Sequence, residues 1–239
     1  MILITERYGV MGRSAPAAND WRVGSMYTFM EAGRLAHVST TTVKNWLFGY
    51  SSGDRTVAPL FHPRDETAVS FLQMIEIMVA ARFRKSKLGR GVRFSTVRDA
   101  YTNARDSFGI EYPFAHLRLD AFGGHIVHFL QQGGPSASVQ SIDAPAQWTL
   151  PELVSQAVDQ LEYEQDLATR WFPVGKAVPI VVDPKLSTGL PTILGRGVTV
   201  QAIRKRFKAG LRIEFIAEDF EMEPSLVETA LQYWEQIAA

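Results

Sequence analysis

The chain has 239 residues, of which 46% are apolar and 21% charged, and these fractions are typical of folded globular proteins. Lysine plus arginine equals aspartate plus glutamate at 25 each, which argues against a surface that coats nucleic acid nonspecifically but allows a local basic patch. Cysteine is absent, so disulfides, thiolate metal sites and a thiol nucleophile are excluded.

No membrane or export segment is expected. The first residues lack the continuous apolar core of a secretory signal, and no apolar run reaches the roughly 18 residues that a membrane span needs. The longest apolar segment, residues 69–81, is interrupted by Ser70, Gln73 and Glu76. We therefore expect a soluble, cytoplasmic protein that has no membrane partner.

Helical patterns dominate the first half of the chain. Apolar spacing and helix-ending residues predict helices over residues 28–37, 40–48, 66–85 and 95–108. Ser95 is the predicted N-cap of the last of these helices and Gly109 its stop. A short strand is predicted at 57–61, and two extended segments around Gly123-Gly124 predict a β-hairpin beginning near Phe114.

A segment rich in Gly, Pro, Ser and Ala follows the predicted hairpin and is typical of a connector. We therefore divide the chain into an N-terminal domain (1–130), a linker (131–149) and a C-terminal domain (150–239). The C-terminal domain is predicted to contain helices at 150–161, 199–209, 213–219 and 224–237 and short strands at 170–173 and 179–182. The predicted fold is mainly α with short β-hairpins: an N-terminal winged helix-turn-helix domain and a small C-terminal helical domain that resembles a helix-turn-helix.

The segment 29–47 carries the pattern of a helix-turn-helix. Gly33 provides the small residue where two helices cross, and Val38 and Val43 provide apolar anchors. His37 stands in the turn, where a residue with positive φ is needed and glycine is commoner. A plain helical hairpin inside a core would show the same apolar spacing, but the polar second helix favours DNA binding.

The exposed face of that second helix is predicted to read DNA. Ser39 is its predicted N-cap, and hydroxyls and free amides in a first turn suit phosphate oxygens. Asparagine pairs with adenine edges, and lysine with guanine or phosphate. The candidate DNA-binding residues of this helix are Ser39, Thr41, Thr42, Lys44 and Asn45.

A basic cluster lies further along the chain, with no acidic residue inside it before residue 99. Its candidate phosphate contacts are Arg82, Arg84, Lys85 and Lys87, and it continues through Arg90, Arg93 and Arg98. The alternative is a solvated helix end, because basic side chains are favoured there by the helix dipole.

A second segment, 213–234, repeats the helix-turn-helix offsets, with Ala217 at the crossing position and Met222 in the turn. Its second helix carries Glu228 and Glu235 and is preceded by Glu223. Carboxylates repel phosphates, so this unit is predicted to pack or to bind a protein partner.

The stretch 180–234 resembles a small domain found in many bacterial and archaeal antitoxins, a domain formerly of unknown function. The resemblance rests on an ordered set of features: a strand ending in Asp-Pro at 180–184, Gly189 and Pro191, a glycine turn at 195–200, and the helical ending from 202 to 234. Glu221 departs from the pattern, since that family usually has glycine in this turn. The upstream half is similar to longer VapB-like antitoxins that carry a MerR-like helix-turn-helix.

The resemblance implies a type II antitoxin that binds and neutralises a PIN-domain ribonuclease toxin. It also implies that the protein binds operator DNA as a homodimer and represses its own operon. It would therefore be no enzyme and would need no cofactor. As aromatic anchors for the toxin we expect Tyr233 and Trp234 in the last helix.

Two other functions compete with this interpretation, and one possible metal site is also weighed. A MerR-like regulator that responds to a small ligand or to a non-nuclease partner would have the same N-terminal half. Carboxylates between Asp159 and Asp166 could serve a metal-dependent nuclease, but their spacing near a predicted helix end favours a solvated face. A metal site on His116, His125 and His128 is disfavoured, because residues three apart on a strand face opposite sides. No metal ligand is therefore assigned.

Overall fold

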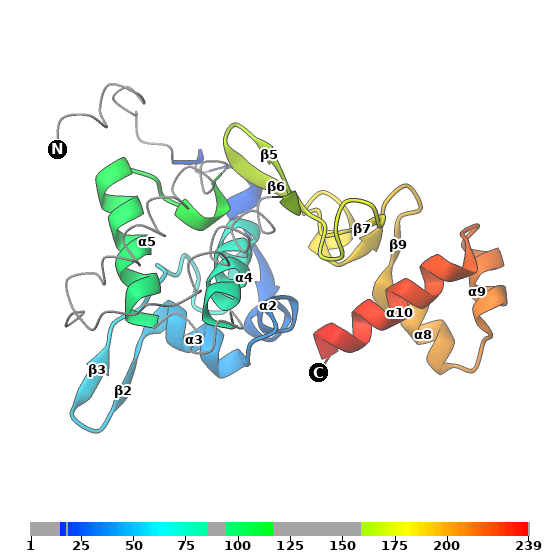
Figure 1. Ribbon diagram of the computed structural model, residues 1–239, viewed down its shortest axis with the longest axis horizontal. Helices are drawn as coiled ribbons and strands as arrows, with labels where there is room; N and C mark the ends of the chain where they lie inside the picture. The colour runs from blue at the N-terminus through cyan, green and yellow to red at the C-terminus, as the bar shows by residue number, and fades with distance from the viewer. Residues whose placement is uncertain (1–14, 18, 86–93, 117–158, 239) are drawn as a thin grey trace, which may run out of the picture.

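The computed structural model describes residues 15–17, 19–85, 94–116 and 159–238. These residues form two hydrophobic clusters, one at each end of an elongated molecule, with short sheets between them (Figure 1). The predicted combination of helices and short antiparallel sheets is confirmed, and the division into domains at 131–149 lies outside the described residues.

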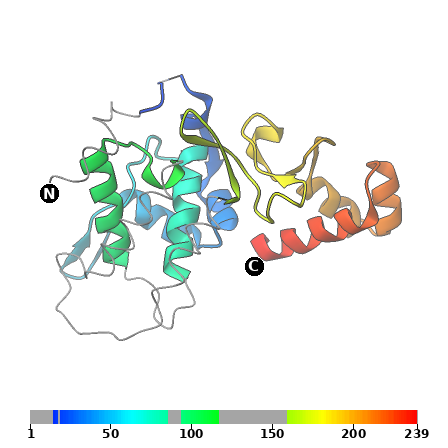
Figure 2. The same cartoon turned by 45° about the horizontal axis from the view of Figure 1, so that its top comes forward.

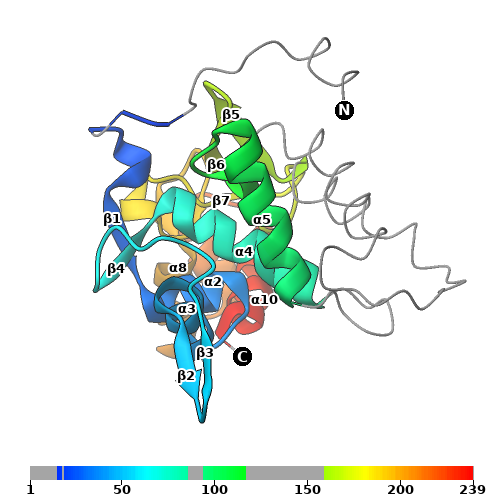
Figure 3. The same cartoon turned by 90° about the vertical axis from the view of Figure 1, so that its left-hand side faces the viewer.

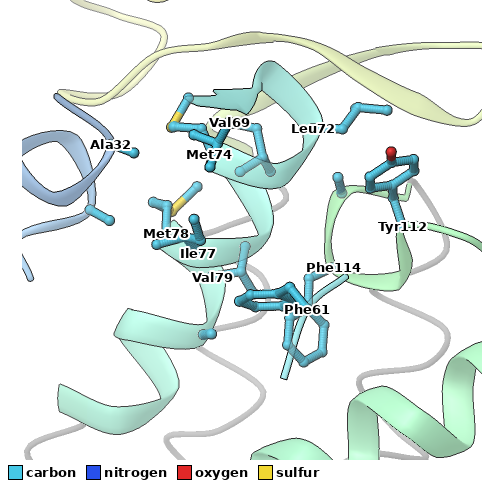
Figure 4. Close-up of a cluster of buried hydrophobic side chains, with 14 of the residues drawn as sticks. Ala32, Phe61, Val69, Leu72, Met74, Ile77, Met78, Val79, Tyr112 and Phe114 are labelled. Carbon is cyan, nitrogen blue, oxygen red and sulfur yellow. The ribbon is translucent and has the colours of Figure 1, made fainter. Parts of the chain in front are cut away.

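The first cluster is built around one central helix. This helix, α4 (Phe71–Lys85), is buried on all sides from Phe71 to Ala81, and Gln73 and Glu76 are the two polar side chains within that span. Around it lie α2 (Phe29–Ala36), α3 (Thr40–Phe48) and α5 (Phe94–Phe108). The close-up shows Met74, Ile77 and Met78 of α4 between Ala32 of α2 and the aromatic pair Phe61 and Phe114 (Figure 4).

Short antiparallel strands frame these helices. Strand β1 (Ser25–Thr28) pairs with β4 (Ala68–Ser70), which leads directly into α4. Strand β2 (Tyr50–Ser52) follows α3 and pairs with β3 (Arg55–Val57). Single 3-10 turns lie at Trp21–Val23 and Pro113–Ala115.

The hairpin of β5 (Leu161–Glu164) and β6 (Leu167–Trp171) belongs to the first cluster, to which it contributes Leu161, Leu167 and Trp171. Arg22 fixes its tip, since the buried guanidinium donates to the carbonyl oxygen of Glu164 at 2.8 Å. The hairpin thereby joins the N-terminal segment to residues beyond the predicted linker.

The second cluster holds the C-terminal part together. A three-stranded antiparallel sheet of β7 (Ile180–Val181), β8 (Thr192–Ile193) and β9 (Val198–Thr199) leads into α8 (Val200–Lys208). Helices α9 (Ile213–Asp219) and α10 (Pro224–Ala238) complete it. The end of α10 runs back toward α2 of the first cluster (Figure 2), and the two helices are in contact.

Several predicted boundaries were wrong for identifiable reasons. The strand expected at 57–61 instead spans Arg55–Val57, because the amides of Leu60 and Phe61 donate to the Trp46 carbonyl oxygen near the end of α3, at 2.7 and 3.0 Å. The helix expected from residue 66 begins at Phe71, where Ser70 and Gln73 exchange capping hydrogen bonds of 2.9 and 3.2 Å.

Three further predictions in the middle of the chain also need correction. Ser95 lies inside α5, which begins at Phe94, and is therefore not its N-cap. Phe114 lies in a 3-10 turn and Leu161 in a strand, instead of in the predicted hairpin and helix. Asp159 is helical as predicted and His116 forms a β-bridge, while residues 117–158, which hold the rest of those two predictions and the linker, lie outside the described residues. In the described part of the chain, no helix has the length and apolar character needed to cross a membrane.

Candidate nucleic-acid interface

Helices α2 and α3 cross at Gly33, as the sequence predicted. A Cβ at Gly33 would lie 2.7 Å from the carbonyl oxygen of Val38, so only glycine permits this close approach. The Val38 amide donates to the Gly33 carbonyl at 2.8 Å and closes the turn. His37 occupies the turn at φ 54°, the positive value that the pattern required.

Both helices of the pair are capped by side chains. Thr28 and Glu31 form a reciprocal capping box at the start of α2, with hydrogen bonds of 2.8 to 3.2 Å. Ser39 caps α3, and its Oγ accepts from the Thr42 amide at 3.1 Å. The predicted N-cap Ser39 is therefore confirmed, and it fixes where the first turn of α3 begins.

The predicted DNA-reading side chains lie on the outer side of α3. Thr41 and Lys44 are exposed, Asn45 is half-buried, and Val43 and Trp46 on the opposite side are buried in the core. Ser39 Oγ and Thr42 Oγ1 lie 2.9 Å apart and hydrogen-bond to each other, which directs both hydroxyls toward the cap. Thr41, Lys44 and Asn45 therefore remain as the side chains best placed to contact a ligand.

The β2–β3 hairpin is a neighbour of α3 that the sequence reading missed. It projects from the body of the protein next to α3 (Figure 3), and every residue from Tyr50 to Thr56 is exposed. The hairpin carries Arg55 near its turn and the exposed ring of Tyr50 at its base. The signal that could have found it is the Gly49 to Gly53 spacing directly after a helix, flanking a strand of polar residues.

Not every residue of the predicted basic cluster is accessible for phosphate contacts. Arg82 is a correction: its guanidinium is largely buried and donates to Gln160, and burial lowers its pKa to about 10. Arg84 is exposed on α4. Lys85 ends α4 with its side chain outside the described set, and Lys87 lies in the segment 86–93 that is likewise outside it. Arg82 therefore holds α4 to the β5–β6 region and is not free to bind phosphate.

The C-terminal pair α9–α10 repeats the turn of α2–α3. The Met222 amide donates to the Ala217 carbonyl at 2.9 Å, as Val38 does to Gly33, and Glu221 adopts φ 50°. Glu221 therefore takes a positive φ, a conformation that glycine adopts without steric cost. The surface of this pair is acidic: Glu214, Glu218, Glu223, Glu228 and Glu235 are all exposed.

The two aromatic residues predicted as partner anchors do not form a free surface. Tyr233 is a correction, since it is 3% exposed and packs inside the second cluster, where burial raises the pKa of its hydroxyl. Trp234 is half-buried beneath the Arg204 guanidinium, which lies 4.9 Å from the ring centroid. Phe207, Leu211 and Phe215, around the corner between α8 and α9, are instead exposed, as is Leu194 in the turn after β8.

Of the carboxylates at 159–166, Asp159 lies at a helix end as expected, and the others lie on the β5–β6 hairpin. Glu162 pairs with Arg170 at 3.3 Å, and Glu164 lies 4.0 Å from Lys185. His116 is buried and bridges to Leu167, while His125 and His128 lie outside the described residues. Within the described ranges, no group of three or more histidine, aspartate or glutamate side chains converges as metal ligands would.

The chain is similar to known proteins over most of its length. A family described only as "Protein of unknown function (DUF433)" matches residues 180–234, the span of the C-terminal sheet and helices. An uncharacterized protein of Mycobacterium tuberculosis, Rv2308, is 28% identical, with 87% of this chain and 89% of that protein aligned. A second protein from that organism, named "Putative antitoxin VapB45", is 24% identical over 86% of this chain and 92% of its own length.

The fold also has a solved counterpart. The crystal structure of Rv2018 from Mycobacterium tuberculosis superimposes with a TM-score of 0.66 at 21% identity, covering 87% of this chain and 98% of that one. The arrangement of both clusters is therefore a known fold, and the chain resembles at least one protein named as an antitoxin across nearly its whole length.

Proposed function

We propose that this protein is the antitoxin of a toxin–antitoxin pair, which acts by binding and not by catalysis. Its N-terminal part binds promoter DNA as a homodimer and represses the operon, and its C-terminal part binds a PIN-domain ribonuclease in the cytoplasm. The observation that carries the DNA proposal is the capped, exposed start of α3 beside the projecting β2–β3 hairpin. Similarity to VapB45 along the chain supports the antitoxin assignment.

We interpret the α2–α3 pair and the β2–β3 hairpin beside it as a MerR-like winged helix-turn-helix, and the close crossing at Gly33 and the exposed hairpin support that interpretation. A helix whose first turn is exposed fits the major groove, where Asn45 and Lys44 can meet base edges. A hairpin beside it meets the backbone, and Arg55 and the Tyr50 hydroxyl supply phosphate contacts. In a dimer on a two-fold operator, the two α3 helices would lie roughly 34 Å apart.

We assign the toxin-binding surface to the corner between α8 and α9 instead of to the last helix. Phe207 and Phe215 are 46% and 51% exposed, and Leu211 between them is 38% exposed, which is unusual for side chains of this size. Arg212 stacks on Phe215 at 5.0 Å from the ring centroid. Aromatic and arginine side chains are enriched among residues that dominate protein interfaces. This corner lies at the far end of the molecule from α3 (Figure 1), so both ligands can bind together.

The DNA proposal is tested by fluorescence anisotropy with the upstream duplex and a scrambled duplex at two salt concentrations. We expect preference for the upstream duplex, retained at the higher salt. Asn45→Ala should reduce that preference. Arg55→Gln should lower the affinity for both duplexes equally, and should reduce the slope of log affinity against log salt concentration by about 1. Arg196→Gln, in the C-terminal part, is the matched control. Equal affinity of the native protein for both duplexes would refute sequence-specific DNA binding.

The toxin proposal is tested with the product of the neighbouring reading frame, if that product has the length and carboxylates of a PIN-domain ribonuclease. The full chain should co-purify with it and suppress its cleavage of RNA. Phe215→Glu should weaken the complex by about tenfold or more, while Val174→Glu, at an exposed apolar position elsewhere, should not. If the Phe215→Glu variant suppresses RNA cleavage as well as the native protein does, the α8–α9 corner is not part of the interface.

A further inference from the structure

The C-terminal part carries its own concentration of basic charge, on α8 and the turn that follows it. Residues 204–212 contain no carboxylate, and their five cations are Arg204, Lys205, Arg206, Lys208 and Arg212. The helix dipole favours basic side chains in the last turn of a helix, which accounts for part of this run. The contacts of each cation therefore decide whether it serves the helix or a partner.

Two of the five cations hold the C-terminal helices together. Arg206 forms an ion pair with Asp219 of α9, and its guanidinium lies 4.1 Å from the ring centroid of Phe220. The Arg204 guanidinium lies 4.9 Å from the ring centroid of Trp234 on α10. These two side chains are therefore engaged within the fold.

The other three cations are exposed, and within the described ranges none of Lys205, Lys208 and Arg212 forms an ion pair. Arg212 is the N-cap of α9, where the helix dipole disfavours a cation, so the dipole does not explain its presence. The three cations alternate along the chain with the exposed apolar side chains of the corner, which are Phe207, Leu211 and Phe215. An exposed apolar patch bordered by charged side chains is typical of an interaction site.

Helix α9 carries the opposite charge. Glu214 and Glu218 are exposed on it, and neither has a basic partner in the part of the chain that the structure describes. The corner thus joins a basic helix to an acidic one, with the exposed ring of Phe207 on the first and that of Phe215 on the second. Opposite charges on two neighbouring helices fix the orientation of a partner, because a reversed partner would bring like charges together.

Single-stranded nucleic acid is the other partner that exposed rings and cations can bind, through bases stacked on the rings. Two observations disfavour it here. The Arg212 guanidinium lies 5.0 Å from the ring centroid of Phe215, so one face of that ring is already covered. Glu214 and Glu218 lie on the same helix as that ring, and their carboxylates repel phosphates. A protein surface with an apolar socket and acidic groups at its rim matches the corner better.

We propose that the toxin surface that receives this corner is an apolar socket with an acidic rim facing α8, and that Lys205 and Lys208 select the toxin through that rim. The socket presupposes the toxin proposal and adds the chemistry by which the toxin is recognised. Charges at the rim of an interface act mainly on the association rate and on partner choice, whereas buried apolar anchors act on dissociation. Lys205 and Lys208 are therefore specificity-determining residues, and Phe207 and Phe215 are the anchors.

The test measures association and dissociation rates between the full chain and the purified product of the neighbouring reading frame by surface plasmon resonance. The association rate of the native protein should fall about tenfold between about 50 and 500 mM salt. Lys205→Glu and Lys208→Glu should each slow association about three- to tenfold and weaken its dependence on salt, with a smaller change in the dissociation rate. The matched control is Lys176→Glu, at an exposed lysine between β6 and β7, which should change both rates less than about twofold.

Neutral variants separate charge from packing. Lys205→Gln and Lys208→Gln remove the charge without reversing it and should give association rates between those of the native protein and the Glu variants. Thermal unfolding shows whether each variant is folded. If the complex forms at rates that neither salt nor these variants change, the acidic rim is wrong and the toxin proposal stands. If the two proteins form no complex, both proposals fail.

A titration of the chain alone with labelled single-stranded RNA tests the nucleic-acid alternative. We expect no binding that depends on the corner. Binding that Lys208→Glu and Phe207→Ala both weaken, and that Lys44→Glu on α3 does not, would assign the corner to nucleic acid and overturn the acidic socket.

Discussion

The α2–α3 and α9–α10 pairs have the same turn but expose different chemistry. Gly33, His37 and Val38 correspond in order to Ala217, Glu221 and Met222, and the same backbone hydrogen bond closes both turns. The first pair then begins its second helix with Ser39 as a hydroxyl cap and threonines, whereas the second has Glu223 and Pro224 there. A shared backbone geometry therefore says little about the ligand, which is selected by the exposed side chains.

The two clusters also bury different kinds of polar group. Glu76 is fully buried in the first cluster, with one carboxylate oxygen accepting from the Tyr101 hydroxyl at 3.2 Å and the other without a partner among the described residues. The second cluster buries the Tyr233 hydroxyl, likewise without a partner among those residues. Of these two groups only the Glu76 carboxyl ionises in the unfolded chain at neutral pH, so burial of Glu76 should make stability depend on pH and burial of Tyr233 should not.

The largest effect, on DNA affinity, is expected when acidic side chains like those of α10 are introduced on α3. Thr41→Glu combined with Lys44→Glu should lower affinity for the upstream duplex by about a hundredfold or more, because carboxylates at the exposed face repel phosphates. Anisotropy titration measures the change. Glu228→Lys in α10 is the reciprocal control, and an equal gain of affinity there would mean that the second pair also contacts DNA.

The residues at the two helix crossings, Gly33 and Ala217, should differ in how much a substitution lowers stability. Gly33→Ala should cost about 1–3 kcal/mol of unfolding free energy, because its Cβ would lie 2.7 Å from a backbone oxygen. Ala217→Gly should cost about 1–2 kcal/mol, through lower helix propensity and the loss of one buried methyl group. Urea unfolding gives both values. Gly24→Ala, whose Cβ would make an ordinary 3.8 Å contact, is the control and should be neutral.

Glu76 should make the first cluster pH-dependent. Burial raises the pKa of its carboxyl well above the ordinary value, although Tyr101, the Phe114 amide and Arg105 favour the charged form, and Glu111 adds to the rise. The folded protein therefore keeps a proton that the unfolded chain releases. This stabilisation is complete below the unfolded pKa and is lost as pH rises toward the folded one.

Glu76→Gln should remove that dependence. Relative to the native protein, the variant should gain stability between about pH 5 and pH 8, by at most roughly 1.4 kcal/mol per pH unit. Urea unfolding across this range measures the difference, and Tyr233→Phe in the second cluster should leave the slope unchanged. Parallel curves for the native protein and Glu76→Gln would contradict a protonated Glu76.

The smallest expected effect concerns the two turns. Glu221→Gly should raise stability by about 0.5–1 kcal/mol, because glycine adopts the observed φ of 50° without steric cost. The lost ion pair with Arg196 is exposed and contributes little. Thermal unfolding detects the gain, and Glu218→Gly inside α9 should have the opposite sign. A loss of stability in Glu221→Gly would show that the glutamate itself stabilises the turn.

The sequence by itself determined the local geometry of both helix pairs. Gly33, the positive φ at His37 and the Ser39 cap could be predicted because helix crossings, turns and caps depend on residues only a few positions apart. The bounds of α9 were predicted to the residue for the same reason. The acidic character of the second pair is also a property of composition, and it needed no tertiary information.

Only the tertiary structure decided which of these side chains stay accessible. Arg82 lies in a basic run, yet it turns inward to Gln160, and Tyr233 lies on a helix end, yet the second cluster covers it. The β2–β3 hairpin and the contact between α10 and α2 were likewise unforeseen, because they depend on strand pairing and on two clusters meeting. Periodicity in a sequence shows which face of a helix is apolar, but what covers that face comes from residues far away along the chain.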